Sequence, residues 1–283
     1  FSLYADYLQT QGVAPSHIIK IDLENITNDH LREPLTLIKY INQQITDSKE
    51  YYVLIDEVQH LQRFEDALNT LLKNSQLDVY VTGSNARFLS KDVVTTFRGR
   101  GDEVRVHPLS FAEYLSVQQP LPFAEQHLNE YMRLGGLPQL VVMNSEQQKR
   151  QYLSQLFANT YLVDIKERYA IRNDDDLEEL IDVIASSIGS LTNPTKIANS
   201  FASVKQSQLS KDTIKRYLDY MQDAFMIEKA VRYDIKGRKY IDTPAKYYFE
   251  DLGLRNARIN FRQTEPTHLM ENLIYNELRV KGY

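Results

Sequence analysis

The chain has 283 residues, of which 42% are hydrophobic and 25% are charged, an ordinary globular composition with length for two or more small domains. Its formal net charge of −5 at pH 7 argues against a protein that coats nucleic acid or an anionic membrane over its whole surface, but leaves room for a local basic patch. The absence of cysteine excludes a disulfide framework and fits a reducing cytoplasm, and no run of about 18 apolar residues is available to span a bilayer. We therefore expect a cytoplasmic protein with no membrane partner.

The first 107 residues alternate between helical periodicity and short apolar runs, which is typical of an α/β domain with a mostly parallel sheet. The opening FSLYADYLQTQG indicates a helix already in progress, so we expect the protein to continue upstream of Phe1. The elements expected next are strand 16–24, helix 28–45, strand 51–58, helix 61–73, strand 77–84 and a helix that includes 92–97. The runs YYVLI and VYV lack polar alternation, as expected for central strands covered on both faces.

After Pro108 the pattern becomes helical. Ser110 is a candidate N-cap for the helix in LSFAEYLS, and helix 123–134 is followed by a GGLP turn at 135–138. Helical periodicity resumes at 146–169 and 174–188. The stretch from 193 to 253 then predicts a helix, a turn, a second helix and a hairpin through Lys236 and Gly237, which is the order of a winged helix.

Two adjacent carboxylates, Asp56 and Glu57, follow the apolar run at 52–55 and match the hhhhDE form of a Walker B strand. In that chemistry the carboxylate at the strand tip reaches the Mg²⁺ shell, and the next one polarises a water for attack on the γ-phosphate. Successive side chains on a strand point to opposite faces, so the tip must bend for both to face a nucleotide. The alternative is an ordinary strand end, where the chain re-enters water.

Small polar residues end the next apolar strand at 82–85, where additional-strand P-loop ATPases place a sensor for the attacking water or the γ-phosphate. Further on, FRGR supplies Arg98 and Arg100, and arginine is the side chain that forks onto phosphate oxygens. The alternative for the two arginines is a solvated helix end favoured by the helix dipole. Spacing alone does not separate these interpretations.

Four stretches carry a family resemblance: YYVLIDEVQHLQRFEDALNTLL, VYVTGSNARFLSKDVVTTFRGRGDEVRVHPLSFAEYL, YMRLGGLP and ENLIYNELRVKGY. In this order they resemble a family of prokaryotic AAA-superfamily ATPases, in which a P-loop domain precedes helices, a winged helix and a C-terminal region similar to PD-(D/E)XK nucleases. The resemblance covers nearly the whole chain. It implies an ATPase core at 1–108 without its Walker A segment, a helical extension at 109–145, a helical and winged-helix domain at 146–243 and the start of a nuclease-like domain at 244–283.

The resemblance also implies roles for single residues. Asp56 would be the Mg²⁺ carboxylate and Glu57 the catalytic base. Ser84 or Asn85 would be the sensor, and Arg98 and Arg100 would face phosphate. The implied function is Mg²⁺-dependent ATP binding and hydrolysis coupled to a winged-helix module that acts on DNA or on a protein partner, and the oligomeric state is left open.

The chain departs from the family pattern at the phosphate-binding loop. No G-x-x-x-x-G-K-[ST] occurs in the 283 residues, and we expect that loop upstream of Phe1. Glu271 matches the helical acid that opens a nuclease-like core, but the strand that would carry the remaining catalytic residues is expected beyond Tyr283. We therefore expect no nuclease activity from these residues alone.

A basic patch lies between Lys205 and Lys239, where nine Lys or Arg and five Asp or Glu give a local charge of +4 (9 − 5). The residues expected to contact DNA are Lys211, Lys215, Arg216, Lys236 and Arg238. The alternative is a surface laced with salt bridges, because Asp212 and Arg216, and Lys215 and Asp219, are four residues apart. A second functional hypothesis follows, a DNA-binding or protein-interaction regulator that uses ATP for stability without sustained turnover.

Overall fold

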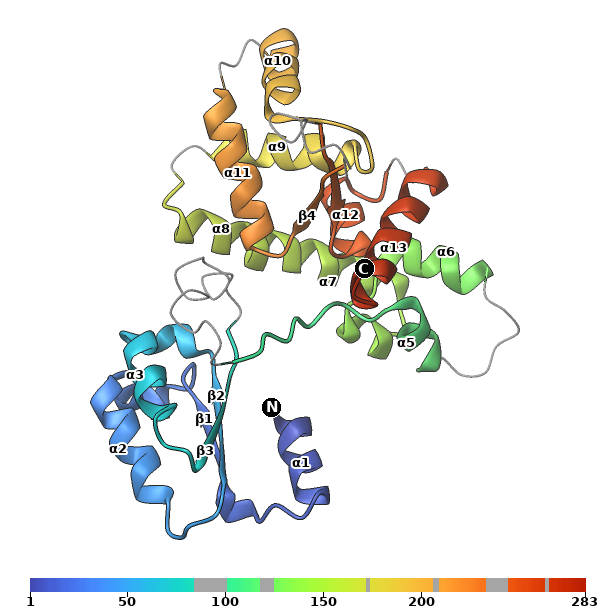
Figure 1. Ribbon diagram of the computed structural model, residues 1–283. Coiled ribbons are helices and arrows are strands. Elements are labelled where there is room, and N and C mark those ends of the chain that lie inside the picture. The colour runs from blue at the N-terminus through green and yellow to red at the C-terminus, as the bar shows by residue number, and fades with distance from the viewer. Residues whose placement is uncertain (84–100, 118–124, 172–173, 206–208, 233–243, 263–264) are drawn as a thin grey trace. The chain divides into compact units, whose positions relative to one another are not determined.

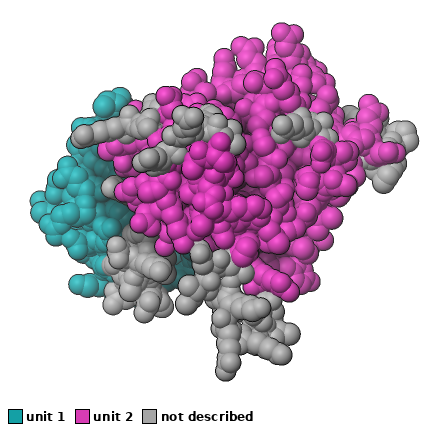
Figure 2. Space-filling view, turned by 90° about the horizontal axis from the view of Figure 1, so that it is seen from above, with its two compact units in different colours: residues 1–104 teal, residues 105–283 magenta. Residues whose placement is uncertain are grey.

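The computed structural model describes residues 1–83, 101–117, 125–171, 174–205, 209–232, 244–262 and 265–283. The chain divides into two compact units, unit 1 at 1–104 and unit 2 at 105–283 (Figure 2). Figure 1 shows the helices and strands of each unit.

Unit 1 contains a parallel sheet in the order β1-β2-β3, so that β2 is the central strand of the three. Its strands are β1 (Ile18–Asp22), β2 (Tyr51–Asp56) and β3 (Leu77–Val81), and its α-helices are α1 (Ser2–Thr10), α2 (Pro34–Gln44) and α3 (Phe64–Leu71). The predicted α/β class with a parallel sheet is confirmed. In register, Ile55 of β2 pairs with Ile21 of β1 and Val81 of β3, so the three carboxyl ends lie at one edge.

The core of unit 1 explains why β2 lacks polar alternation. Val53, Leu54 and Ile55 are at most 1% exposed although successive residues point to opposite faces of the sheet. Leu37 from α2 and Leu71 from α3 belong to the same buried cluster as Val53 and Ile55. The predicted coverage of this strand on both faces is confirmed.

The prediction of one helix over 28–45 is wrong. The structure has a 3₁₀-helix at Ile26–Arg32, an extended residue at Glu33 (φ −94°, ψ 125°) and then α2. Pro34 disfavours the α conformation of the residue before it and is itself suited to the first helical turn. The Glu33 carboxylate accepts a hydrogen bond from Thr36 N at 2.8 Å and so caps α2.

Unit 2 is largely helical. Its elements are α5 (Phe111–Ser116), α6 (Glu125–Leu134), α7 (Glu146–Leu156), α8 (Val163–Arg168), α9 (Asp174–Ser186), α10 (Pro194–Lys205), α11 (Lys211–Asp223), β4 (Ile227–Ala230), β5 (Lys246–Phe249), α12 (Leu252–Arg258) and α13 (Pro266–Val280). A π-helical segment, Phe157–Leu162, joins α7 to α8. Ser110 caps α5, as the sequence predicts, and the structure shows that it forms a capping box with Glu113.

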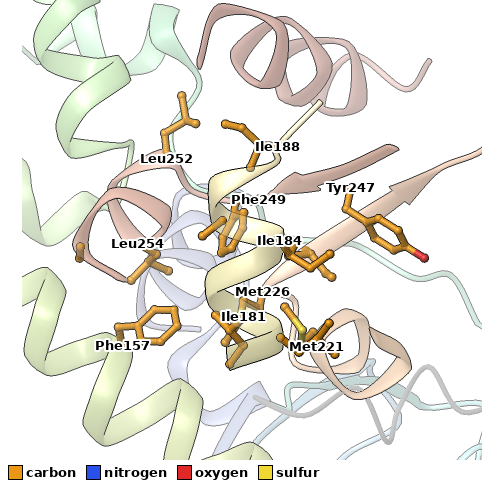
Figure 3. Close-up of a cluster of buried hydrophobic side chains, with 14 of the residues drawn as sticks. Phe157, Ile181, Ile184, Ile188, Met221, Met226, Tyr247, Phe249, Leu252 and Leu254 are labelled. Carbon is orange, nitrogen blue, oxygen red and sulfur yellow. The ribbon is translucent and has the colours of Figure 1, made fainter. Parts of the chain in front are cut away.

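One hydrophobic core connects these elements. Figure 3 shows its centre, where Ile184 of α9, Met221 of α11, Phe249 of β5 and Leu254 of α12 gather. Each of these four side chains is at most 2% exposed. The core contains residues from all three segments into which the sequence divides this half of the chain, and that division stays a prediction.

Candidate nucleotide site and its surroundings

The chain bends sharply where β2 ends. Asp56 is the last residue of the strand, and Glu57 adopts a left-handed conformation with φ 53° and ψ 50°. Residues other than glycine rarely adopt this conformation, which costs roughly 1–2 kcal/mol. The bend interrupts the alternation of the strand immediately after Asp56, before the short helix Val58–His60 begins.

Thr82, the first residue after β3, holds this bend. Its hydroxyl donates a hydrogen bond to Asp56 Oδ1 and accepts one from Glu57 N at 3.1 Å. Its carbonyl accepts from Val58 N at 3.0 Å, and its own N–H donates to Ile55 O at 3.0 Å. A single threonine thus connects four consecutive positions of the neighbouring strand end. Such a network is what a strained backbone needs in order to persist.

The two carboxylates differ in their surroundings, although both are half-buried. Asp56 Oδ1 accepts from Thr82, and within the described part of the chain Asp56 Oδ2 has no hydrogen-bond partner. Glu57 Oε2 accepts from Gln59 Nε2. A carboxylate with one oxygen fixed and the other open suits a hard cation such as Mg²⁺, which prefers oxygen ligands. The residues present therefore fit the Mg²⁺ that the family resemblance of the sequence implies.

The contact between Thr82 and Asp56 was not predicted from the sequence. The parallel register of β2 and β3 is the feature that could have predicted it. Ile55 pairs with Val81, so the next pair along the two strands is Asp56 with Thr82. Four of the predicted site residues, Ser84, Asn85, Arg98 and Arg100, lie outside the described residues. Their roles stay predictions.

The predicted basic helix is α11. Ser210 accepts a hydrogen bond from Thr213 N at 3.1 Å and caps this helix. Its inward face is buried at Ile214, Leu218 and Met221, and its exposed basic side chains are Lys211, Lys215 and Arg216. Among the described side chains, no ion pair joins Asp212 to Arg216 or Lys215 to Asp219, although burial raises the pKa of Asp219 and the nearby charge of Lys215 acts to lower it. Lys236 and Arg238 lie outside the described residues.

The elements around α11 follow the order helix α9, helix α10, helix α11, strand β4, strand β5. The two strands pair antiparallel, with Ile227 opposite Phe249. An isolated antiparallel bridge joins Thr192, between α9 and α10, to Ala245 just before β5. The connection between the first two helices is thereby placed beside the strand pair.

A second pair of adjacent acids, Glu250 and Asp251, follows β5 and is used differently. Asp251 is 3% exposed and its two oxygens accept from Gly136 N at 2.7 Å and Leu254 N at 3.0 Å. Burial raises the pKa of Asp251 to about 6, although these N–H donors oppose the shift. A Cβ on Gly135 would overlap the Asp251 carboxylate, which explains the glycine there. Asp251 thus holds the GGLP turn against the start of α12, and we call this contact the joint.

Glu271, on α13, also has protein partners. Lys246 Nζ and the Tyr248 hydroxyl both donate to Glu271 Oε1, the latter at 2.6 Å. Burial acts to raise the pKa of Glu271, but the hydrogen bonds from Lys246 and Tyr248 outweigh it and lower the pKa. In the part of the chain that the structure describes, no group of three or more His, Cys, Asp or Glu is placed to hold a metal ion.

Two family models match this chain. An AAA-domain family model matches residues 2–115, and a second model, a domain of unknown function (DUF8612), matches 125–265. The segment that carries the parallel sheet and the acidic tip of β2 is thus similar to an AAA domain. No helix in the described ranges is both long and apolar enough to cross a membrane.

An uncharacterized protein of Haemophilus influenzae is 34% identical over 284 residues, which cover 99% of this chain and 70% of that protein. This chain belongs to the family of that protein. Uncharacterized protein MJ1544 of Methanocaldococcus jannaschii is 28% identical over 271 residues, which cover 92% of this chain and 59% of that protein. The structure of the Aeropyrum pernix ORC1 protein in complex with DNA aligns over 89% of this chain and 79% of that chain, with 11% identity and a TM-score of 0.28.

Proposed function

We propose that the full-length protein is a Mg²⁺-dependent ATPase whose hydrolytic site lies at the carboxyl end of β2. The observation that carries the proposal is the network in which Thr82 fixes both Asp56 and the bent backbone of Glu57. An ordinary strand end that only re-enters water does not need a left-handed glutamate held from the neighbouring strand. The AAA-domain match over residues 2–115 supports the same assignment.

In this proposal each residue has a separate task. Asp56 holds Mg²⁺ through its open oxygen, and bound Mg²⁺ supplies charge neutralisation for the phosphates. Glu57 orients a water and accepts its proton. Ser84 or Asn85 serves as the sensor, and Arg98 and Arg100 face phosphate oxygens.

The DNA part of the proposal rests on α11 and its neighbours. The order α10, α11, β4, β5 and the Thr192–Ala245 bridge support the winged helix that we predict from the sequence between residues 193 and 253. Lys211, Lys215 and Arg216 lie exposed on α11, where they would contact DNA phosphates. The alternative is a regulator that binds ATP without sustained turnover.

Steady-state phosphate release by the full-length protein, with and without DNA, separates the two functions. Glu57→Gln keeps the shape of the side chain, so ATP binding should persist while turnover falls roughly a hundredfold, the scale lost with a general base. Glu24→Gln is the matched control, since Glu24 is an exposed acid just after the neighbouring strand β1. ATP binding without turnover in the unmodified protein would support the regulator, and unchanged turnover in Glu57→Gln would remove Glu57 from the role of base.

A further inference from the structure

Arg105, the first residue of unit 2, lies between two carboxylates from the strand pair β4–β5. Its Nη1 donates to Glu228 Oε1 of β4, and its Nη2 donates to Glu250 Oε1, directly after β5. The guanidinium carbon also lies 5.0 Å from the centre of the Phe225 ring. The side chains of Arg105, Glu228 and Glu250 are only 27%, 14% and 11% exposed. This forked arrangement uses the planar geometry of arginine, which lysine lacks.

Helix α13 and His107 complete the cluster. Glu228 Oε2 accepts from the Tyr275 hydroxyl at 2.9 Å and from Arg279 Nε at 3.0 Å. His107 Nδ1 lies 3.5 Å from Glu250 Oε2, and burial followed by the nearby arginine lowers the pKa of His107, which keeps the ring neutral near pH 7. The cluster therefore brings the guanidinium groups of Arg105 and Arg279 together with the carboxyl groups of Glu228 and Glu250.

Within the described residues, the first residues of unit 2 have few other attachments to the rest of that unit. Residues 105–107 form neither helix nor strand, and Val106 is 90% exposed. The next backbone hydrogen bond along the segment is from Leu109 N to Gly136 O, at 2.8 Å. Of the residues before Pro108 in unit 2, Arg105 and His107 are the two whose side chains face the cluster.

We infer that Arg105, Glu228 and Glu250 form a releasable latch that holds the chain leaving the AAA domain against β4, β5 and α13. When the latch opens, residues 105–108 leave unit 2 while its hydrophobic core stays folded. The apolar side chain of Val106 contributes nothing to the core that would be lost, since it is already exposed. Glu228 keeps Arg279 as a partner, and Glu250 can stay protonated without Arg105 because burial raises its pKa to about 8. The inference does not depend on ATP hydrolysis.

Trypsin cleavage after Arg105 measures the opening of the latch, because trypsin cuts there only when the Arg105 side chain is no longer bound by Glu228 and Glu250. Glu228→Gln weakens the latch and leaves Arg105 available for cleavage. Glu178→Gln is the matched control, since Glu178 likewise shares two cations, Lys166 and Arg258, elsewhere in unit 2. We expect Glu228→Gln to raise cleavage between Arg105 and Val106 by roughly tenfold over the control, because cleavage tracks the population of the open form.

Hydrogen exchange distinguishes local release from unfolding. The latch is supported if the Leu109 amide exchanges faster in Glu228→Gln than in Glu178→Gln. The core amides of α9 and α11 should be equally protected in the two variants. Unchanged cleavage would overturn the latch, and so would cleavage that rises together with exchange throughout the core. Arg105→Lys provides a second variant, since lysine keeps the charge and the trypsin site but cannot hold both carboxylates in the same forked geometry. If Arg105→Lys resisted trypsin as well as the wild type does, the latch would also be contradicted.

Discussion

Thr82 donates its hydroxyl hydrogen to Asp56 across the ends of the neighbouring strands β3 and β2. The same oxygen accepts from Glu57 N, so one side chain orients one acid and fixes the backbone of the next. The half-buried Thr82 hydroxyl has both a donor and an acceptor partner and is therefore satisfied, which makes this link rigid. The orientation of the two acids is therefore a property of two strands and not of β2 alone.

The first prediction concerns Thr82→Val, which keeps the shape of the side chain and removes the hydroxyl. Turnover by the full-length protein should fall about tenfold or more, because Asp56 loses the bond that sets its orientation. The Mg²⁺ concentration for half-maximal activity should rise as well. Thermal stability should stay unchanged, which would show that the rise does not come from a loss of fold. Thr82→Ser should restore both quantities. Wild-type Mg²⁺ dependence in Thr82→Val would show that the hydroxyl does not orient the acid.

The second prediction separates strain from chemistry at Glu57. Glu57→Gly should raise the stability of unit 1 by about 0.5–1 kcal/mol, because glycine adopts the left-handed conformation without a steric penalty. The same change should abolish most of the ATP turnover. Arg63→Gly is the control, since Arg63 also has a positive φ of 47° and no proposed role in catalysis. It should stabilise the protein and leave turnover intact. Equal losses of activity in the two variants, measured beside denaturant unfolding, would count against a role for Glu57.

Local features of the fold were predictable because their causes are local. The capping box at Ser110, the cap at Ser210 and the burial of β2 follow from residues within a few positions of one another. The break at Glu33 was missed because helical periodicity was given more weight than the proline that follows it.

The two acidic pairs show where sequence alone fails. Asp56–Glu57 and Glu250–Asp251 both follow an apolar strand, and the short pattern is similar. The difference lies in their partners, since Asp251 is held by Gly136, 115 positions away along the chain. Only the fold reveals that, among the described residues, Asp56 keeps one oxygen without a hydrogen-bond partner, whereas both oxygens of Asp251 accept hydrogen bonds.

The third prediction tests the joint at Asp251. Asp251→Asn should lower the free energy of unfolding by about 1–3 kcal/mol, because an amide presents one acceptor and a donor where two N–H groups need acceptors. Asp212→Asn, at an exposed position of α11, should change stability by less than about 0.5 kcal/mol. Denaturant unfolding measures both. A wild-type midpoint in Asp251→Asn would mean that the joint is not needed for stability.

The fourth prediction is a pH dependence at Glu250. Burial raises the pKa of this group from 4.5 to about 8, so its contribution to stability is full below about pH 4.5 and is lost as pH rises through about 8. Glutamine does not titrate. The Tm of Glu250→Gln minus the Tm of the wild type should therefore increase as the pH rises from about 5 to about 9. A difference that stays constant over this range would show that Glu250 ionises in the folded protein as it does in the unfolded chain.

The last prediction decides whether α11 contacts nucleic acid. Replacing Lys211, Lys215 and Arg216 together by Glu should weaken DNA binding for unrelated sequences alike, because phosphate contacts carry no base preference. Each lost contact should reduce the slope of log K against log salt by about 0.9, as measured by fluorescence anisotropy. Stability should change little, since all three side chains are exposed.

The matched control for this test is the replacement of three exposed lysines of unit 1, Lys20, Lys39 and Lys73, by Glu. It changes the net charge by the same amount, so a loss of binding that comes from overall charge would appear in both variants. Loss confined to the α11 variant, with a shallower salt slope, assigns the contact to that helix. Equal binding by the α11 variant and the wild type, or a wild-type protein without salt-dependent DNA affinity, would make this helix a solvated surface. Its buried face at Ile214, Leu218 and Met221 would then serve only the core of unit 2, and the proposed winged helix would be better explained as a protein-interaction module.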